Sequence, residues 1–341
     1  MSDMIRQVPS LEPNEWQKKQ MERQFGMFIH FGVNTFGNVE WSRGDIPALS
    51  FKPTAIDADQ WVRTAYEAGM NYVVLITKHH DGFCLWHTDT TKYSVKYSGN
   101  TTDIVAEVAR ACKKYGMALG LYYSLWDCTA PEYKEENFDT QYVPYMLKHL
   151  TELMDGRYGE IVELWLDGAW EKPRSKWGLD QIYDTVKRLQ PGCQIGVNHT
   201  VGIDNDLAMF PEKRYLPENY QENDPLRMYP SDFRLWDPNM CRTDDPKIYT
   251  YGGEEYYLPF EMTICAREGF SWFYSNIYED KPSMNAAEVA EKCRILFETN
   301  NCALLNMPPN WNGQICQGDI DYLMQVAERL GRRRIWKGTE K

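Results

Sequence analysis

Short apolar runs alternate with amphipathic segments along almost the whole chain, and this rhythm limits the possible folds more than any other feature. The apolar runs cover residues 26–32, 72–80, 117–124, 160–167, 194–199, 261–265 and 302–307, with a weaker run expected after Leu296. Apolar residues at helical spacing predict helices over 58–68, 102–115, 143–153, 179–189, 285–297 and 319–330. Buried strands that alternate with helices indicate a parallel sheet covered by helices. About eight such units, with no GxGxxG after the first run, predict an α/β fold of the (β/α)8 TIM-like barrel class rather than a doubly wound sheet.

One segment interrupts this rhythm. Residues 200–258 are rich in Pro, Asp, Asn and Tyr and show no clear periodicity. Loops of this length in a compact domain are usually functional. We therefore expect a long insertion after strand 5 that lies over the active-site face of the barrel. We also expect residues 1–341 to form a single catalytic barrel domain, because little chain follows the last strand and its helix.

Charge and composition narrow the class of partner. Lys and Arg number 37 against 49 Asp and Glu, and the net charge of −12 argues against nucleic acid and anionic membranes as partners. No apolar run in the sequence is long enough to span a membrane. Aromatic residues make up 14% of the chain, with 12 Trp and 22 Tyr. Because flat rings cover the apolar face of a sugar, this content favours a small-molecule or oligosaccharide substrate.

The cysteines and the first residues bear on localisation. The nine cysteines are scattered, with no CxxC pair and no Cys/His cluster at zinc spacing. The first ten residues lack the charged and apolar stretches of a signal peptide. Both features favour a cytoplasmic protein, or a periplasmic or secreted one if a leader has been removed. The sequence does not indicate an oligomeric state.

Polar and aromatic residues gather where the predicted strands end, which is the catalytic face in barrels. They are His30, His79, His80, Tyr122, Trp165, Asp167, His199 and Glu261, and they include four of the six histidines. Asp167 stands between an apolar strand and Gly168, so it either faces the barrel mouth or caps a turn. Adjacent residues such as His79 and His80 point to opposite faces of a strand, and HxH or HxxxH spacings are absent. We therefore expect no metal site and no cofactor.

The inventory at the strand ends suits glycoside hydrolysis. That reaction needs two carboxyl groups across the scissile bond. One attacks the anomeric carbon or positions water, and the other protonates the leaving oxygen. Histidine, tyrosine and tryptophan side chains supply the hydrogen bonds and the stacking surfaces that hold a sugar.

Six motifs give the sequence a specific resemblance. They are FGMFIHFG at 25–32, Glu40-Trp41, KHHDGF at 78–83, GLYYS at 120–124, ELWLDG at 163–168 and LLNMPP at 304–309. In this order, the chain resembles the retaining α-L-fucosidase family of glycoside hydrolases. The family's catalytic domain is a barrel, sometimes irregular, that is usually followed by a β-sandwich. This chain departs from the family there, because it stops after the predicted barrel.

The resemblance implies a double-displacement hydrolysis of terminal α-L-fucosyl residues and a role for each matched residue. Asp167 matches the nucleophile. Glu261, in a stretch similar to a Trp-Glu motif of the family, is expected to be the acid/base. Such a retaining pair has its carboxyl groups ~5–5.5 Å apart. The residues expected to bind the sugar are His30, Glu40, Trp41, His79, His80, Tyr122, Trp165 and Trp272.

Alternatives remain at this stage. The rival acid/base residues are Glu218, Glu222, Asp237, Glu254 and Glu255. The chain could be a catalytically weak carbohydrate-binding relative, or a glycosidase of a related sugar such as a galactoside. A metal-dependent hydrolase that uses the histidines is a third alternative.

Overall fold

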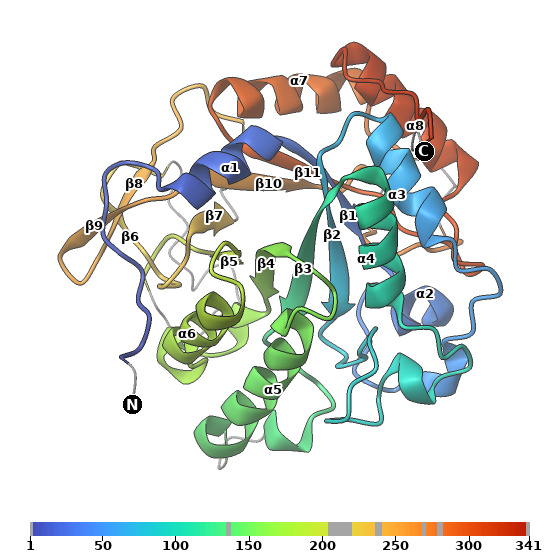
Figure 1. Cartoon of the computed structure of the whole chain (residues 1–341), viewed down its shortest axis with the longest axis horizontal. Coiled ribbons are helices and arrows are strands. Elements are labelled where there is room, and N and C mark those ends of the chain that lie inside the picture. The colour runs from blue at the N-terminus through green and yellow to red at the C-terminus, as the bar shows by residue number, and fades with distance from the viewer. Residues whose placement is uncertain are drawn as a thin grey trace.

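A computed structural model describes residues 3–133, 138–203, 220–235, 241–267, 271–277 and 282–338. Eight parallel strands close into a barrel in the order β1-β11-β10-β7-β5-β4-β3-β2 (Figure 1). The barrel strands are β1 (Phe25–Ile29), β2 (Tyr72–Lys78), β3 (Ala118–Ser124), β4 (Ile161–Asp167), β5 (Gln194–Val197), β7 (Phe233–Leu235), β10 (Phe260–Ile264) and β11 (Cys302–Asn306). The predicted (β/α)8 TIM-like barrel is thus confirmed.

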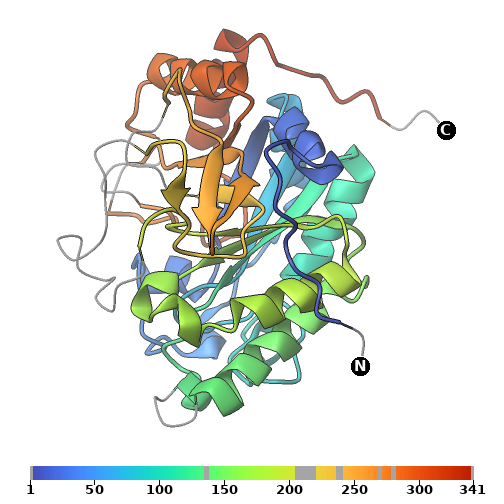
Figure 2. The same cartoon turned by 90° about the vertical axis from the view of Figure 1, so that its left-hand side faces the viewer.

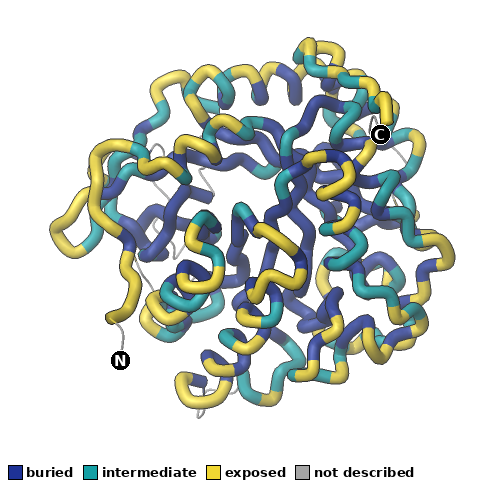
Figure 3. Tube along the Cα trace, viewed as in Figure 1, coloured by how far each residue is buried: buried dark blue, intermediate teal, exposed yellow. Residues whose placement is uncertain are grey.

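Helices cover the outside of the barrel, as Figures 1 and 2 show. The six predicted helices are present as α3 (Ala58–Glu67), α4 (Ile104–Tyr115), α5 (Val143–Met154), α6 (Leu179–Leu189), α7 (Ala286–Glu298) and α8 (Gln317–Arg329). The strands are buried throughout, whereas the outer faces of the helices are exposed (Figure 3). This difference explains the two sequence patterns, continuous apolar runs in the strands and helical periodicity between them. None of the described helices is long and apolar enough to cross a membrane.

Two further helices, α1 (Glu15–Arg23) and α2 (Val33–Gly37), were not predicted. A capping box starts α1, since Asn14 accepts a hydrogen bond from the backbone of Gln17 and the Gln17 side chain accepts one from the backbone of Asn14. The sequence pattern Asn-x-x-Gln is a signal that could have revealed this helix. Gln17 also donates to the carbonyl oxygens of Asp232 and Tyr257, just before β7 and β10. Helix α1 therefore lies at the amino-terminal ends of the barrel strands.

The sixth barrel strand corrects two expectations. Strand β7 lies inside residues 200–258 and pairs with β5 and β10, so the barrel itself passes through the segment that we expected to be an insertion. The strand expected after Leu296 does not exist, because Leu296 belongs to α7 and β11 begins at Cys302. Strand β7 escaped prediction because it has three residues and its middle one is Arg234. That guanidinium is fully buried and forms an ion pair with Asp245.

A small sheet of β6 (Asp224–Pro225), β8 (Ile248–Tyr251) and β9 (Glu254–Tyr257) occupies other parts of the same segment. Strands β8 and β9 form a hairpin whose turn, Gly252-Gly253, has the positive φ angles that two-residue hairpin turns need. The hairpin hydrogen-bonds Ser10 near the N-terminus and leads into the start of β10. It therefore stands in the place of a helix between β7 and β10, towards the amino-terminal ends of the strands. We expected the whole segment to lie over the active-site face, but this part of it lies at the opposite end of the barrel.

Candidate active site

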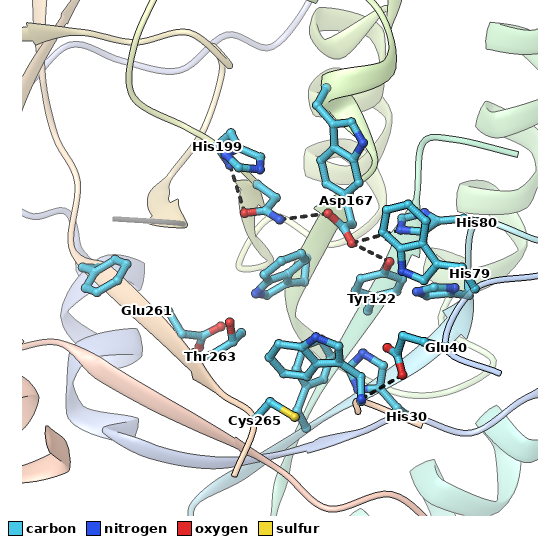
Figure 4. Close-up of a pocket in the computed structure, with 17 residues that line it drawn as sticks. His30, Glu40, His79, His80, Tyr122, Asp167, His199, Glu261, Thr263 and Cys265 are labelled. Carbon is cyan, nitrogen blue, oxygen red and sulfur yellow. Dashed lines mark hydrogen bonds and ion pairs between the residues drawn. The ribbon is translucent and has the colours of Figure 1, made fainter. Parts of the chain in front are cut away.

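A cavity of about 590 Å³ opens where the barrel strands end (Figure 4). Each residue that the sequence analysis assigned to the site lines it. These residues are His30, Glu40, Trp41, His79, His80, Tyr122, Trp165, Asp167, Glu261 and Trp272. They come from five different strands and the loops that follow them, so that only closure of the barrel brings them together.

The carboxyl group of Asp167 is fixed on both of its oxygens. Tyr122 donates a hydrogen bond of 2.7 Å to Oδ2, and the Asn198 side-chain amide donates one of 2.9 Å to Oδ1. His80 Nε2 lies 3.7 Å from Oδ2. Burial raises the pKa of Asp167, and the hydrogen bonds from Asn198 and Tyr122 oppose that rise. The carboxylate is therefore held in one orientation, in a site largely closed to water.

The backbone after β4 explains why Asp167 faces the cavity rather than capping a turn. Its two side-chain hydrogen bonds come from β3 and from the residue after β5, the two strands that flank β4 in the barrel. Gly168 follows with φ of 76°, and a Cβ there would lie 2.7 Å from that of Trp126. Only glycine accepts both this φ and this close approach. The Asp-Gly pair thus lets the chain turn away sharply and leaves the carboxylate at the mouth.

Three buried histidines face the same cavity. His30 Nδ1 is 2.7 Å from the side-chain oxygen of Asn306, and His80 Nδ1 is 2.7 Å from the Ser124 hydroxyl. Burial lowers the pKa of His30 and His79 well below 6.5, and it lowers the pKa of His80 to about 3. All three rings are therefore neutral near pH 7, and each has one nitrogen that donates and one that accepts.

The two adjacent histidines correct one expectation. His79 and His80 both line the cavity, with ring centroids 4.1 Å apart, although we expected them to point to opposite faces. Strand β2 ends at Lys78, so the alternation of a strand no longer applies to the residues that follow. Within the described ranges, no group of three or more His, Cys, Asp or Glu residues is arranged to hold a metal ion.

Glu40 is the second carboxyl group at the mouth of the barrel. Its Oε2 accepts hydrogen bonds from the backbone of Trp272 at 3.0 Å and Phe273 at 3.3 Å. Its Oε1 is buried and has no hydrogen-bond partner in the described parts of the chain. Burial raises the pKa of Glu40 to about 7, against the two backbone hydrogen bonds. Glu40 can therefore hold or release a proton near neutral pH.

Glu261 lies at the floor of the cavity rather than at its mouth. Its Oε2 accepts a hydrogen bond of 2.6 Å from Tyr72, and the Glu163 carboxyl group lies beside it. Glu163 also pairs with Arg23 at 3.2 Å. Glu163 precedes Asp167 by four residues in β4, a rise of about 13 Å along a strand. The structure thus places the Glu261 carboxyl with this buried cluster and does not bring it to Asp167.

The rival carboxyl groups are not at the mouth either, where the structure describes them. Glu222 is exposed and accepts hydrogen bonds from the backbone of Lys247 and Ile248. Glu254 and Glu255 are exposed on the β8–β9 hairpin. Glu218 and Asp237 lie outside the described residues.

The structure adds site residues that the sequence analysis missed. Asn198 donates a hydrogen bond to Asp167. Trp170 lines the cavity beside Trp41, and the two rings are stacked with their centroids 6.5 Å apart. Asn198 directly follows β5, so the strand-end argument that selected His199 could also have selected it. Trp170 follows the Asp-Gly turn in a short helical segment, and no sequence signal marked it.

Comparisons with known proteins agree with this geometry. The sequence profile described as alpha-L-fucosidase matches residues 45–333. Alpha-L-fucosidase 1 of Arabidopsis thaliana is 34% identical over 334 residues, which cover 94% of this chain and 60% of the plant protein. The crystal structure of SpGH29 has a TM-score of 0.74 at 28% identity, covering 96% of this chain and 70% of that one. Alpha-L-fucosidase isoenzyme 1 from Paenibacillus thiaminolyticus has a TM-score of 0.71 at 27% identity, and the match covers 92% of this chain and 75% of that one. This chain thus spans less than two thirds of the length of the plant relative.

Proposed function

Because this chain belongs to the alpha-L-fucosidase family, we propose that it hydrolyses terminal α-L-fucosyl residues of glycans. The observation that carries the proposal is the setting of Asp167. Its carboxylate is buried, oriented by Tyr122 and Asn198, and surrounded by three neutral histidines and several tryptophans. A cavity of about 590 Å³ is large enough for one sugar ring and the reacting oxygen.

In the proposed mechanism, Asp167 attacks the anomeric carbon and the bond from that carbon to the leaving oxygen breaks. A proton donor gives its proton to the leaving oxygen, which departs as a hydroxyl group. The same group then takes a proton from water as the water attacks the anomeric carbon and releases Asp167. Both displacements invert the carbon, so the product retains the configuration of the substrate.

The role of proton donor suits Glu40 better than Glu261. A general acid works best when its pKa lies near the operating pH, and burial raises the pKa of Glu40 to about 7. Its unpartnered Oε1 is available to a substrate oxygen. Glu261 also has a buried Oε1 without a partner in the described parts of the chain, but its Oε2 accepts a hydrogen bond from Tyr72 and its carboxyl group lies beside Glu163 at the floor of the cavity. We therefore move the assignment from Glu261 to Glu40, with Glu218 as the rival to be tested beside it.

Sugar recognition follows from the neutral histidines and the rings. His30, His79 and His80 can each donate to and accept from sugar hydroxyl groups without adding charge to the site. The face of Trp272 lies near His30, with ring centroids 5.2 Å apart, and offers an apolar surface for the ring or the methyl group of fucose. A galactose-like sugar has one more exocyclic hydroxyl group, which such a surface rejects only by ~10²-fold.

We expect the wild-type protein to release p-nitrophenol from p-nitrophenyl α-L-fucoside, and to cleave p-nitrophenyl α-L-galactoside about 10²-fold more slowly. The ratio of the two kcat/KM values measures the sugar preference. Turnover of the galactoside alone would replace fucose as the substrate. A folded protein that binds fucose but turns over neither compound would instead be a carbohydrate-binding relative.

The pH dependence should report the two carboxyl groups. Asp167 must be ionised to attack, so activity falls as the pH drops through its raised pKa. Glu40 must be protonated to donate, so activity falls as the pH rises through about 7. We expect a bell-shaped profile of kcat/KM whose alkaline limb lies near pH 7, and we expect Glu40→Gln to remove that limb.

Reaction with azide distinguishes a Glu40 that donates the proton from a Glu40 that only binds the sugar. With an activated aryl fucoside, a variant without its acid/base accumulates the covalent intermediate, and azide then attacks the anomeric carbon and displaces Asp167. Glu40→Gln should therefore be accelerated by azide and form a fucosyl azide of retained configuration. Glu261→Gln, the matched control, should keep the alkaline limb and show no azide effect. If azide instead accelerates Glu218→Gln or Glu261→Gln, that residue is the proton donor.

A further inference from the structure

A second cavity, of about 670 Å³, is lined by Trp126, whose ring packs against two residues that line the first cavity. The Trp126 ring lines the second cavity, and its centroid is 5.0 Å from His80 and 5.7 Å from Trp41, which both line the first. The Trp126 carbonyl oxygen accepts hydrogen bonds from the Ser124 hydroxyl at 2.7 Å and from Lys78 at 3.4 Å. Trp126 thus connects the linings of the two cavities, and its backbone is held by these hydrogen bonds.

The chain itself links the rims of the two cavities. Arg43 lines the second cavity and follows Trp41, a wall of the first, by two residues. Glu171 lines the second cavity and directly follows Trp170, another wall of the first. A molecule that extends out of the first cavity past these two tryptophans would therefore meet Arg43 and Glu171 next.

The polar groups of the second cavity suit hydroxyl groups. Glu171 Oε1 is buried and has no hydrogen-bond partner among the residues that the structure describes. Burial raises the pKa of Glu171, and Lys172 and Arg43 oppose that rise. The carboxylate of Asp127 is already neutralised by Lys78, at 3.1 Å. The second cavity thus offers one carboxyl acceptor, one guanidinium donor and the ring of Trp126, with little net charge.

We propose that the second cavity binds the neutral sugar unit to which the fucose is attached, and that Arg43 and Glu171 select this unit through its hydroxyl groups. The proposal rests on the fucosidase function proposed above. Glu171 accepts hydrogen bonds from the sugar, Arg43 donates to its oxygens, and Trp126 covers its apolar face. A sulfated or carboxylated sugar can pair its anionic group only with Arg43 and would repel the Glu171 carboxylate, whereas a neutral sugar uses both groups.

A substrate without a leaving sugar provides the test. α-L-Fucosyl fluoride releases a single atom and so does not use the second cavity, whereas 2′-fucosyllactose and 3-fucosyllactose each carry a neutral sugar there. Arg43→Ala and Glu171→Gln should each lower kcat/KM for at least one fucosyllactose by about tenfold, as expected for the loss of one charge-assisted hydrogen bond. The kcat/KM for the fluoride should stay within about twofold of wild type, since neither residue lines the first cavity.

The control is a second Arg/Glu pair far from both cavities. Arg110 and Glu107 form an exposed ion pair on α4, and Arg110→Ala and Glu107→Gln should change neither substrate's turnover. Equal losses on the fluoride and the fucosyllactoses, or no loss on either, would overturn the proposal while leaving the fucosidase function intact. A wild-type protein that does not cleave the fluoride would overturn the fucosidase function itself, and the second sugar site with it.

Discussion

Asp167→Asn is expected to lower kcat/KM for p-nitrophenyl α-L-fucoside by about 10⁴-fold or more, the scale seen when an enzyme loses its nucleophile. Asparagine has almost the same shape as aspartate, so its oxygen can still accept from Asn198 while its amide group donates to the Tyr122 hydroxyl oxygen. What is lost is the negative charge that attacks the anomeric carbon. Measurement of kcat/KM with the purified variant, at the pH optimum of the wild type, checks the prediction.

The melting temperature of Asp167→Asn distinguishes loss of the nucleophile from misfolding of the variant. Burial raises the pKa of Asp167 in the folded protein, so its ionised form opposes folding at neutral pH. The neutral asparagine removes this cost, and we expect a melting temperature equal to or higher than that of wild type. Azide should also restore part of the activity with inversion, since it takes the place of the missing carboxylate. An inactive variant with a lower melting temperature and no azide rescue would contradict the assignment.

Lys78→Met is expected to lower the free energy of unfolding by about 3–5 kcal/mol, the cost of breaking a buried ion pair from one side. Lys78 and Asp127 are both fully buried, with 3.1 Å between Nζ and Oδ2. Lys78 also lies 4.6 Å from the ring centroid of Tyr123. Methionine fills the space of the aliphatic stem but leaves the Asp127 carboxylate without its counter-charge. Urea denaturation of wild type and variant measures the difference.

A double variant tests the cause of that loss. Asp127 also accepts hydrogen bonds from the backbone of Thr129 and Ala130, and asparagine keeps an oxygen for them. Adding Asp127→Asn to Lys78→Met removes the uncompensated charge and should recover part of the lost stability. Lys114 pairs with Asp59 on the surface, so Lys114→Met is the exposed control. If Lys78→Met is no more destabilising than Lys114→Met, the buried pair does not support the two loops that carry His79 and His80 after β2 and Trp126 after β3.

Most of the architecture follows from periodicity. Seven barrel strands and six outer helices agree with runs that the sequence displays, because strands buried on both faces must be apolar and helices on a barrel must be amphipathic. The exception shows the limit of this argument. Strand β7 has a charged residue at its centre, and its ion pair with Asp245, together with hydrogen bonds to Pro246 and Tyr249, makes Arg234 tolerable in the interior.

By itself, the sequence determined the barrel and the residues at the ends of its strands, since alternation and strand ends are local properties of the chain. Only the tertiary structure decided how deep those residues lie and which groups they contact. Glu261 points into the barrel, but its depth depends on the register of β10 against β7 and β11, which places it with Tyr72 and Glu163. Glu40 has a pKa of about 7 because a segment more than 200 residues away buries it, and its hydrogen bonds come from the backbone of Trp272 and Phe273. Depth and burial arise from contacts between distant segments, which no local pattern in the sequence records.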